Sequence, residues 1–385
     1  MRKHTHPTMS KFDSIRPFYD SEANAAILKI IDDPMLEAMM SFTFPQDNPS
    51  HWKDLMRHTH SLRDFQINFI YPGLMKVLEK SSEGLTTGGF EILKPDTAYL
   101  FISNHRDIIL DTSLFNSCLF EKGLAMTTSA IGDNLIKKPF LHILSRLNRN
   151  FAIRRGLSGR ALFESSLIAS EFICRSLLRE NRSVWTAQRE GRTKDGNDST
   201  HKGVLKMLTL AEGGKDPFSY FEKINVVPIS ISYEYDPTDI LKMPELLAKS
   251  KDEKYVKGEN EDFVNLLRGI MGTKKRIHIQ VNGVLDDEIK QISAMDVSQT
   301  EKLTQLAAVI DQRIWSGYRL WPSNYIAHDL LHRQFRYADQ YALAEKEDFE
   351  RRLHGKVDTS NPLLVKNFLS MYAYPVDNYL KTIQQ

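Results

Sequence analysis

The amino-acid sequence predicts an α/β fold, a mixed, mostly parallel sheet flanked by helices. From residue 85 onward, short apolar runs alternate with longer segments of helical periodicity, which is the order expected of a layered domain. Before and after this part, residues 1–84 and 299–385 carry helical patterns interrupted by prolines. We therefore expect a helical N-terminal section, an α/β core over residues 85–298 and a helical C-terminal section.

The N-terminal section is predicted to consist of successive helices. Helical periodicity over residues 21–31 is followed by a second segment that starts at Pro34. A third segment, residues 52–77, has an apolar face that Pro72-Gly73 interrupts. These breaks predict a set of short helices rather than one long one.

In the core, short apolar and β-branched runs predict the strands, and apolar residues at helical spacing predict the helices between them. Pro228 places its strand at a sheet edge or at a strand start, because proline cannot donate to a ladder. The charged segment 237–262 is expected to be a helical surface insertion, and residues 300–318 a helix. Strands are predicted at residues 90–93, 98–103, 124–127, 151–155, 184–187, 225–233 and 276–281, and helices at 111–120, 135–147 and 161–178.

Composition narrows the class of protein. The chain has 51 Lys and Arg against 49 Asp and Glu, so a globally basic nucleic-acid binder is not indicated. Its two cysteines, Cys118 and Cys174, lie in apolar helix-like segments, which favours a reducing compartment and neither a disulfide nor a cysteine nucleophile. Residues 1–7 lack the pattern of a secretory signal, and no apolar run approaches the length of a spanning helix. We expect a cytoplasmic protein, soluble or peripheral on the inner face of the membrane.

The first candidate site is a strand-to-helix turn that holds His105 with two carboxylates, Asp107 and Asp111. A histidine base needs a partner that fixes its ring and stabilises its charged form, and either aspartate is a candidate. Six residues of continuous helix would separate His105 from Asp111 by about 9 Å and turn them onto different faces. His105 must therefore precede the helix on a bent segment. The alternative is a plain helix start that Asp107 caps.

Arginines at strand ends form the second candidate site. Arg154, Arg155 and Arg192 are so placed, and a guanidinium donates two parallel hydrogen bonds to a phosphate or carboxylate. Residues 134–192 carry twelve Lys and Arg against four Asp and Glu. This excess predicts an anionic partner, unless it is only the solvated face of a helix.

Taken in order, four short motifs resemble those of the glycerolipid acyltransferase superfamily, over about residues 85 to 285. The first departs from the family pattern because Asp111 lies six rather than five residues beyond the histidine, and the third because it reads Glu-Gly-Arg-Thr instead of Glu-Gly-Thr-Arg. Residues 15–20 and 320–325 make the chain similar to a divergent bacterial branch with extra helical segments. The motifs are Asn104-His105 with Asp111, Phe151-Ala152-Ile153-Arg154-Arg155, Glu190-Gly191-Arg192-Thr193 and Val227-Pro228-Ile229.

The resemblance implies that His105 removes a proton from an acceptor hydroxyl, with Asp111 favoured over Asp107 as its partner. It implies a fatty acyl thioester of CoA or acyl carrier protein as donor, and a glycerol phosphate or lysophospholipid as acceptor. No metal or bound cofactor is expected, and no nucleic acid. The helix over residues 135–147 packs on the core or dips into a peripheral membrane surface. The substrate-binding residues implied are Asn104, Asp107, Arg154, Arg155, Glu190, Gly191 and Arg192.

Three other functions stay open at this point. The altered third motif is compatible with an amine acceptor, which would give an N-acyl amino acid or a related lipid. A metal-dependent hydrolase would use His105, Asp107 and Asp111 as ligands, although no second cluster at ligand spacing accompanies them. A non-catalytic module for anionic lipid or nucleic acid would use the basic residues 134–192.

Overall fold

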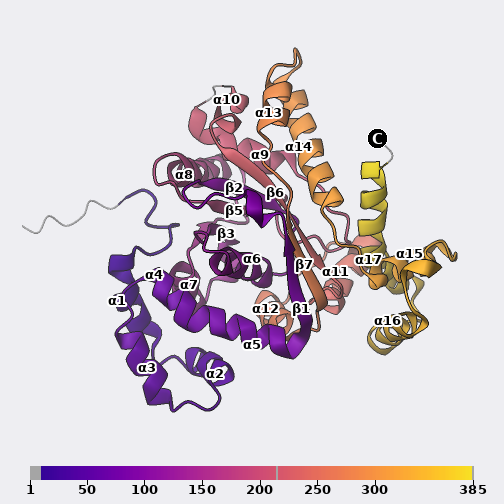
Figure 1. Cartoon of the computed structure of the whole chain (residues 1–385), viewed down its shortest axis with the longest axis horizontal. Helices are drawn as coiled ribbons and strands as arrows, with labels where there is room; N and C mark the ends of the chain where they lie inside the picture. The colour runs from indigo at the N-terminus through magenta and orange to yellow at the C-terminus, as the bar shows by residue number, and fades with distance from the viewer. Residues whose placement is uncertain (1–9, 214–215, 384–385) are drawn as a thin grey trace, which may run out of the picture.

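The computed structural model describes residues 10–213 and 216–383, so the residues 1–7 considered for a secretory signal lie outside it. A seven-stranded sheet with the order β1-β7-β6-β2-β5-β3-β4 forms the centre (Figure 1). All neighbouring strands are parallel except β6 and β7, which confirms the predicted mixed, mostly parallel sheet flanked by helices. The strands are β1 Ser82–Gly88, β2 Tyr99–Ser103, β3 Thr128–Gly132, β4 Asn150–Ile153, β5 Val184–Ala187, β6 Asn225–Tyr233 and β7 Lys275–Val281.

Short helices precede the sheet, as the proline pattern predicted. Asp33 and Asn48 each accept a hydrogen bond from the backbone two residues on, and a proline follows each of them in the first turn. Pro72-Gly73 does not interrupt the helical segment as predicted, since Pro72 lies in the first turn of α5, directly after five residues of π-helix. The elements are α1 Asp20–Ile30, α2 Pro34–Thr43, α3 Pro49–Arg57, α4 Leu62–Phe65, η1 Gln66–Ile70 and α5 Tyr71–Ser81.

The other helices flank the sheet or follow it, and the C-terminal α15 to α17 lie to one side of it, away from α1 to α5 (Figure 1). In the described residues no helix is long and apolar enough to cross a bilayer. The helices are α6 Leu110–Glu121, α7 Pro139–Leu147, α8 Gly159–Leu178, α9 Lys202–Thr209, α10 Pro217–Phe221, α11 Asp239–Ser250, α12 Glu261–Met271, α13 Asp286–Ser293, α14 Gln299–Ser316, α15 Pro322–His332, α16 Leu343–Lys356 and α17 Pro362–Ile383. Short 3₁₀ turns are η2 Phe90–Ile92, η3 Asp133–Leu135, η4 Leu210–Glu212 and η5 Ala338–Gln340.

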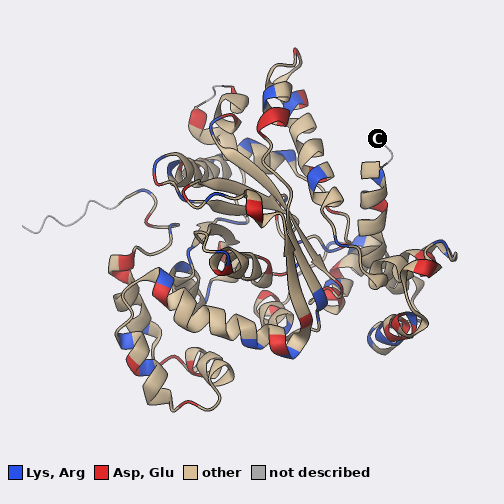
Figure 2. Ribbon diagram, in the orientation of Figure 1, with Lys and Arg blue, Asp and Glu red and all other residues tan. Residues whose placement is uncertain are grey.

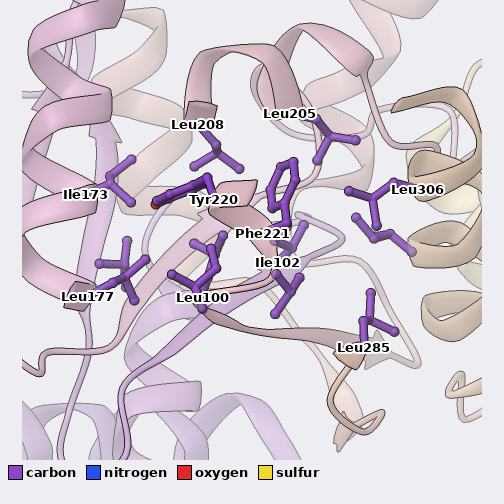
Figure 3. Packing of buried hydrophobic residues seen from close by; sticks show 14 of the residues in the cluster. Leu100, Ile102, Ile173, Leu177, Leu205, Leu208, Tyr220, Phe221, Leu285 and Leu306 are labelled. Atoms are coloured by element: carbon purple, nitrogen blue, oxygen red, sulfur yellow. The ribbon is translucent and has the colours of Figure 1, made fainter. Parts of the chain in front are cut away.

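The core lies on both faces of the sheet because the central strand β2 is buried on both sides. Leu100 and Ile102 point into a cluster with side chains of α8, α9, α10 and α14 (Figure 3). Tyr99 and Phe101 point the other way, toward α5 and α6. Strands β2 to β6 contain no charged residue, and Figure 2 shows them uniformly tan. Each large apolar side chain buried in this way contributes about 1.5–3 kcal/mol, which anchors the end of β2 from which the candidate site extends.

Three sequence predictions about strands are wrong. Residues 90–93 form the turn η2, and the strand expected at 124–127 begins only at Thr128. Pro228 lies in an interior strand, not at a sheet edge or strand start. The β6–β7 ladder begins at Ile229, and the Pro228 carbonyl accepts a hydrogen bond from the backbone N–H of Asn282 at 3.0 Å, just beyond the end of β7, so the missing N–H of Pro228 falls at the end of that ladder.

The helix expected over residues 135–147 is shorter, Pro139–Leu147, and packs on the N-terminal helices. Its Phe140, Leu141 and Leu147 are buried in one cluster with α1. Of the two expectations for this segment, packing on the core is therefore the observed one.

Candidate active site

His105 lies on a bent segment between β2 and α6, and its partner is Asp111. The Nδ1 of His105 lies 2.7 Å from Oδ2 of Asp111. The same oxygen accepts hydrogen bonds from the backbone N–H of Arg106 at 2.6 Å and of Asp107 at 3.1 Å. The turn thus wraps around one carboxylate oxygen at the start of α6. This curl accommodates the six-residue spacing and settles which aspartate contacts the histidine.

The second oxygen of Asp111 is held by Tyr233 from β6. The Tyr233 hydroxyl donates to Oδ1 of Asp111 at 2.8 Å, and both side chains are buried. Burial and the nearby carboxylates raise the pKa of Tyr233 well above its usual value, so the phenol stays protonated and remains a donor. Four donors therefore hold the Asp111 carboxylate in place beside the imidazole.

Asp107 caps the helix and does not reach the cavity described below. Its Oδ1 accepts hydrogen bonds from the backbone N–H of Ile109 at 3.0 Å and Leu110 at 2.8 Å. Burial, with the adjacent charge of Asp111, raises the pKa of Asp107. A substrate-binding role for Asp107 was expected, and the structure corrects this expectation, because the side chain is buried against Gly269 of α12.

Asn104 is also a positioning residue. It is fully buried, its Oδ1 accepts from the backbone N–H of Ile231 at 2.8 Å, and its Nδ2 donates to the carbonyl of Ile231 at 2.9 Å. The amide therefore ties the end of β2 to β6 with both of its polar ends. This placement corrects the expectation that Asn104 contacts substrate, since neither end is turned to the cavity.

A buried ion pair between Arg106 and Asp198, next to His105 in the chain, was not predicted from the sequence. Arg106 Nη2 lies 2.6 Å from Oδ2 of Asp198, and both residues are buried. The Tyr318 hydroxyl donates to the same oxygen at 2.5 Å. Asp198 belongs to the loop after β5, whose Thr193 N–H donates to the carbonyl of His105 at 2.8 Å. Through these contacts the loop supports the turn that carries His105.

The loop reaches the C-terminal helix α17 at a glycine. Gly196 has a φ of +82°, and a Cβ there would lie 2.1 Å from the carbonyl oxygen of Met371. Only glycine fits this backbone conformation and this close approach. The position of Asp198 is thus coupled to α17.

His105 lies in the wall of a cavity of about 640 Å³, and five predicted binding residues line it as well. The Arg155 guanidinium pairs with Glu190 at 2.6 Å, and Nη1 of Arg192 donates to the Thr238 hydroxyl at 3.2 Å. The Trp185 ring meets the edge of the imidazole with centroids 5.5 Å apart. The predicted residues in the wall are Arg154, Arg155, Glu190, Gly191 and Arg192, and apolar side chains that complete it include Ile131, Leu135, Leu162, Val204 and Met207.

The chemistry available to His105 in the cavity wall depends on which nitrogen of its imidazole carries the proton. Because Nδ1 of His105 is bonded to Asp111, Nε2 is the nitrogen left to accept a proton. Asp111 then faces the positive charge that the ring acquires. The arrangement suits a general base in the wall of a cavity that arginine side chains also line.

His105, Asp107 and Asp111 are not arranged as metal ligands. One oxygen of Asp107 accepts hydrogen bonds at the start of α6, and the two oxygens of Asp111 accept hydrogen bonds from four donors. Among the residues that the structure describes, these three do not bring ligand atoms together around one point. Their geometry therefore does not favour the hydrolase alternative.

The cysteines are not placed for nucleophilic chemistry. Both are free thiols, and neither lines the cavity. Burial raises the pKa of Cys118 to about 12 and also raises that of Cys174. A thiolate is therefore disfavoured at both positions.

Asp311 of α14 gives this region a predicted pH dependence. Its Oδ1 accepts from the backbone N–H and the hydroxyl of Thr200, and burial raises its pKa to about 7. Because the folded state holds this proton more tightly, stability falls as pH rises from about 4 to 7. Asp311→Asn keeps the acceptor and removes the charge. We expect its free energy of unfolding, relative to wild type, to rise between pH 5 and pH 8 by up to about 3 kcal/mol. Urea unfolding of both proteins at pH 5 and pH 8 measures this difference in the free energy of unfolding. A difference that is the same at both pH values would contradict the prediction.

Comparison with known proteins gives two findings. Residues 85–232 match the family model described as Acyltransferase. Among solved structures, the chain is similar to the 1-acyl-sn-glycerophosphate acyltransferase of Thermotoga maritima, with 13% identity, a TM-score of 0.36, and coverage of 76% of this chain and 94% of that one. No curated protein sequence matches the chain.

Proposed function

Because residues 85–232 match the family model described as Acyltransferase, we propose that the protein is a glycerolipid acyltransferase that esterifies a hydroxyl of a glycerol phosphate or lysophospholipid. The acyl donor is a fatty acyl thioester of CoA or acyl carrier protein. One observation carries this proposal: His105, which is paired with Asp111, lies in the wall of the same cavity as Arg154, Arg155 and Arg192. The cavity thus combines a base for a hydroxyl with a site for a phosphate.

In the proposed reaction, Nε2 of His105 takes the proton of the acceptor hydroxyl while its oxygen attacks the thioester carbonyl. The tetrahedral intermediate collapses by breaking the carbon–sulfur bond, and the leaving thiolate takes the proton from the imidazolium. Asp111 stabilises the imidazolium between these steps. General-base help of this kind contributes about 10² to 10⁴ in rate. Since the thioester is already activated, the proposal needs no metal or cofactor.

The acceptor phosphate is placed among the guanidinium groups. Arg155 follows β4 and Arg192 follows β5, and both line the cavity, so both can donate hydrogen bonds to one phosphate. Arg155 also holds Glu190, which fixes a carboxylate near the acceptor hydroxyls. Positioning of this kind lowers the entropic part of the barrier.

The apolar wall of the cavity suits the acyl chain of the donor, and the lipid enters from a peripheral membrane surface on the cytoplasmic side. Leu162 and Phe163 of α8 support this direction. Their side chains are exposed, and Leu162 also lines the cavity. The exposed Arg160 beside them is suited to anionic headgroups.

An acceptor screen tests the substrate class. Purified protein is given acyl-CoA or acyl carrier protein thioesters, with glycerol 3-phosphate, a lysophosphatidic acid, unphosphorylated glycerol lipids and amino acids as acceptors. Mass spectrometry should find acyl esters of the phosphorylated acceptors. Products on amines alone would favour the N-acyl alternative and overturn the proposal.

Arg192→Ala is expected to raise the KM for the phosphorylated acceptor by about 10- to 100-fold, the value of one or two charge-assisted hydrogen bonds. The KM for the thioester should change little. Arg351→Ala is the matched control, since it removes an exposed arginine of α16 that lies outside the cavity wall. If both variants raise the acceptor KM equally, Arg192 does not bind the phosphate.

A further inference from the structure

Two histidines and an aspartate meet where α15 and α17 pack together, outside the wall of the cavity that His105 lines. The sequence prediction that the chain holds no second cluster at ligand spacing is therefore wrong. These helices are in extensive contact, and Figure 1 shows them side by side. His328 and His332 are one helical turn apart on α15, and Asp377 faces them from α17. One ligand atom from each lies within 4.8 Å of the other two.

The distances fit a tetrahedral ion with little rearrangement. Ligand bonds of about 2.0–2.1 Å place neighbouring donor atoms about 3.3 Å apart around Zn²⁺. The Nε2 of His328 already lies 3.3 Å from Oδ1 of Asp377. His332 is exposed and its ring centroid lies 4.5 Å from that of His328, so a side-chain rotation can close the remaining distance.

The buried member of the group is held in place by its neighbours. His328 is 4% exposed, and the Tyr337 ring packs edge-on against it with centroids 5.1 Å apart. Its Nδ1 lies 3.4 Å from the amide of Gln334. With that amide turned so that its oxygen faces the ring, Nδ1–H donates to it and the Nε2 lone pair is free for a metal. Such outer partners commonly orient metal-bound histidines.

From this geometry we propose that His328, His332 and Asp377 bind one Zn²⁺ ion per chain, with water as the fourth ligand. Two imidazoles with one carboxylate favour zinc over the hard cations Mg²⁺ and Ca²⁺, which select oxygen ligands. The ion ties α15 to α17. Because α17 contacts Gly196 in the loop that carries Asp198, the bound ion also stabilises this loop, which in turn supports the turn that carries His105.

The test uses the full chain without an affinity tag, titrated with ZnCl2 near neutral pH by calorimetry, with bound metal counted by elemental analysis. We expect one equivalent of Zn²⁺ per chain with a Kd in the micromolar range or below, and a Tm that rises with added zinc. His332→Ala and Asp377→Asn should each weaken binding at least tenfold. Both keep the buried His328, so they are the variants of choice.

His354→Ala is the matched control, because it removes an exposed histidine of the same C-terminal section on α16. It should bind zinc as the wild type does. Absence of binding by the wild type, equal binding by His332→Ala, or equal loss in His354→Ala would each overturn the proposal. Co²⁺ in place of Zn²⁺ gives a second readout, since a tetrahedral site yields strong visible absorption that the His332→Ala protein should lack.

Discussion

Replacement of His105 by alanine is expected to lower kcat/KM for acyl transfer by about 10²- to 10⁴-fold, because the acceptor hydroxyl loses its general base. The fold should persist. Asp111 keeps two backbone N–H donors and the Tyr233 hydroxyl, so no unsatisfied carboxylate is created. The rate of thiol release from acyl-CoA measures the loss, and circular dichroism verifies the fold.

His51→Ala serves as the control for this prediction. The Nδ1 of His51 on α3 also faces a carboxylate, that of Asp47 at 3.3 Å, but this pair is exposed and lies in the N-terminal section. Its activity should equal that of the wild type. Comparable losses in both variants, or full activity of His105→Ala, would remove His105 from the role of base.

The second large effect is expected for Asp198→Asn, which should lower the free energy of unfolding by about 3–5 kcal/mol. The variant leaves the charge of Arg106 buried without its counter-ion, and breaking a buried pair from one side is costly. Activity should fall as well, because the turn that carries His105 loses its support. Urea unfolding with a parallel activity assay measures both.

Asp195→Asn is the matched control on the same loop. Asp195 pairs with Lys249 at 3.3 Å, and the lysine side chain is 72% exposed. An exposed pair contributes about 0–1 kcal/mol, so this variant should be close to wild type. If Asp195→Asn lowers the free energy of unfolding as much as Asp198→Asn does, the buried Arg106–Asp198 pair does not stabilise the fold more than an exposed pair.

Local patterns in the sequence predicted much of this fold. Residues 184–187 and 225–233 were predicted as strands with the bounds that β5 and β6 have. Dense apolar and β-branched runs flanked by polar turns identify such strands without tertiary information. At 90–93 the run is as apolar, but Gly89 takes a left-handed φ of +74° and the chain turns instead. Where short apolar runs are ambiguous, a single backbone conformation decides.

For the candidate site, the sequence indicated the residues that line the cavity but not those that support them. The order of motifs pointed to His105, Asp111 and Arg192, which the structure brings to one region. Asp198 is 92 positions from Arg106 in the chain, and no local pattern links the two. The family resemblance implies a substrate contact for Asn104, and the structure places it elsewhere. Its role as a tie to β6 depends on a strand partner that only the folded chain supplies.

Acceptor-dependent thiol release by the purified protein tests the central claim most directly. Free thiol from a fatty acyl thioester is followed with and without a lysophosphatidic acid or glycerol 3-phosphate, for the wild type and for His105→Ala. We predict that the wild type releases thiol at a rate that rises and saturates with the acceptor, in step with ester formation, and that the variant does not. Thiol release by the wild type that is independent of any acceptor, or that persists in His105→Ala, would contradict an acyl transfer in which His105 acts as the base.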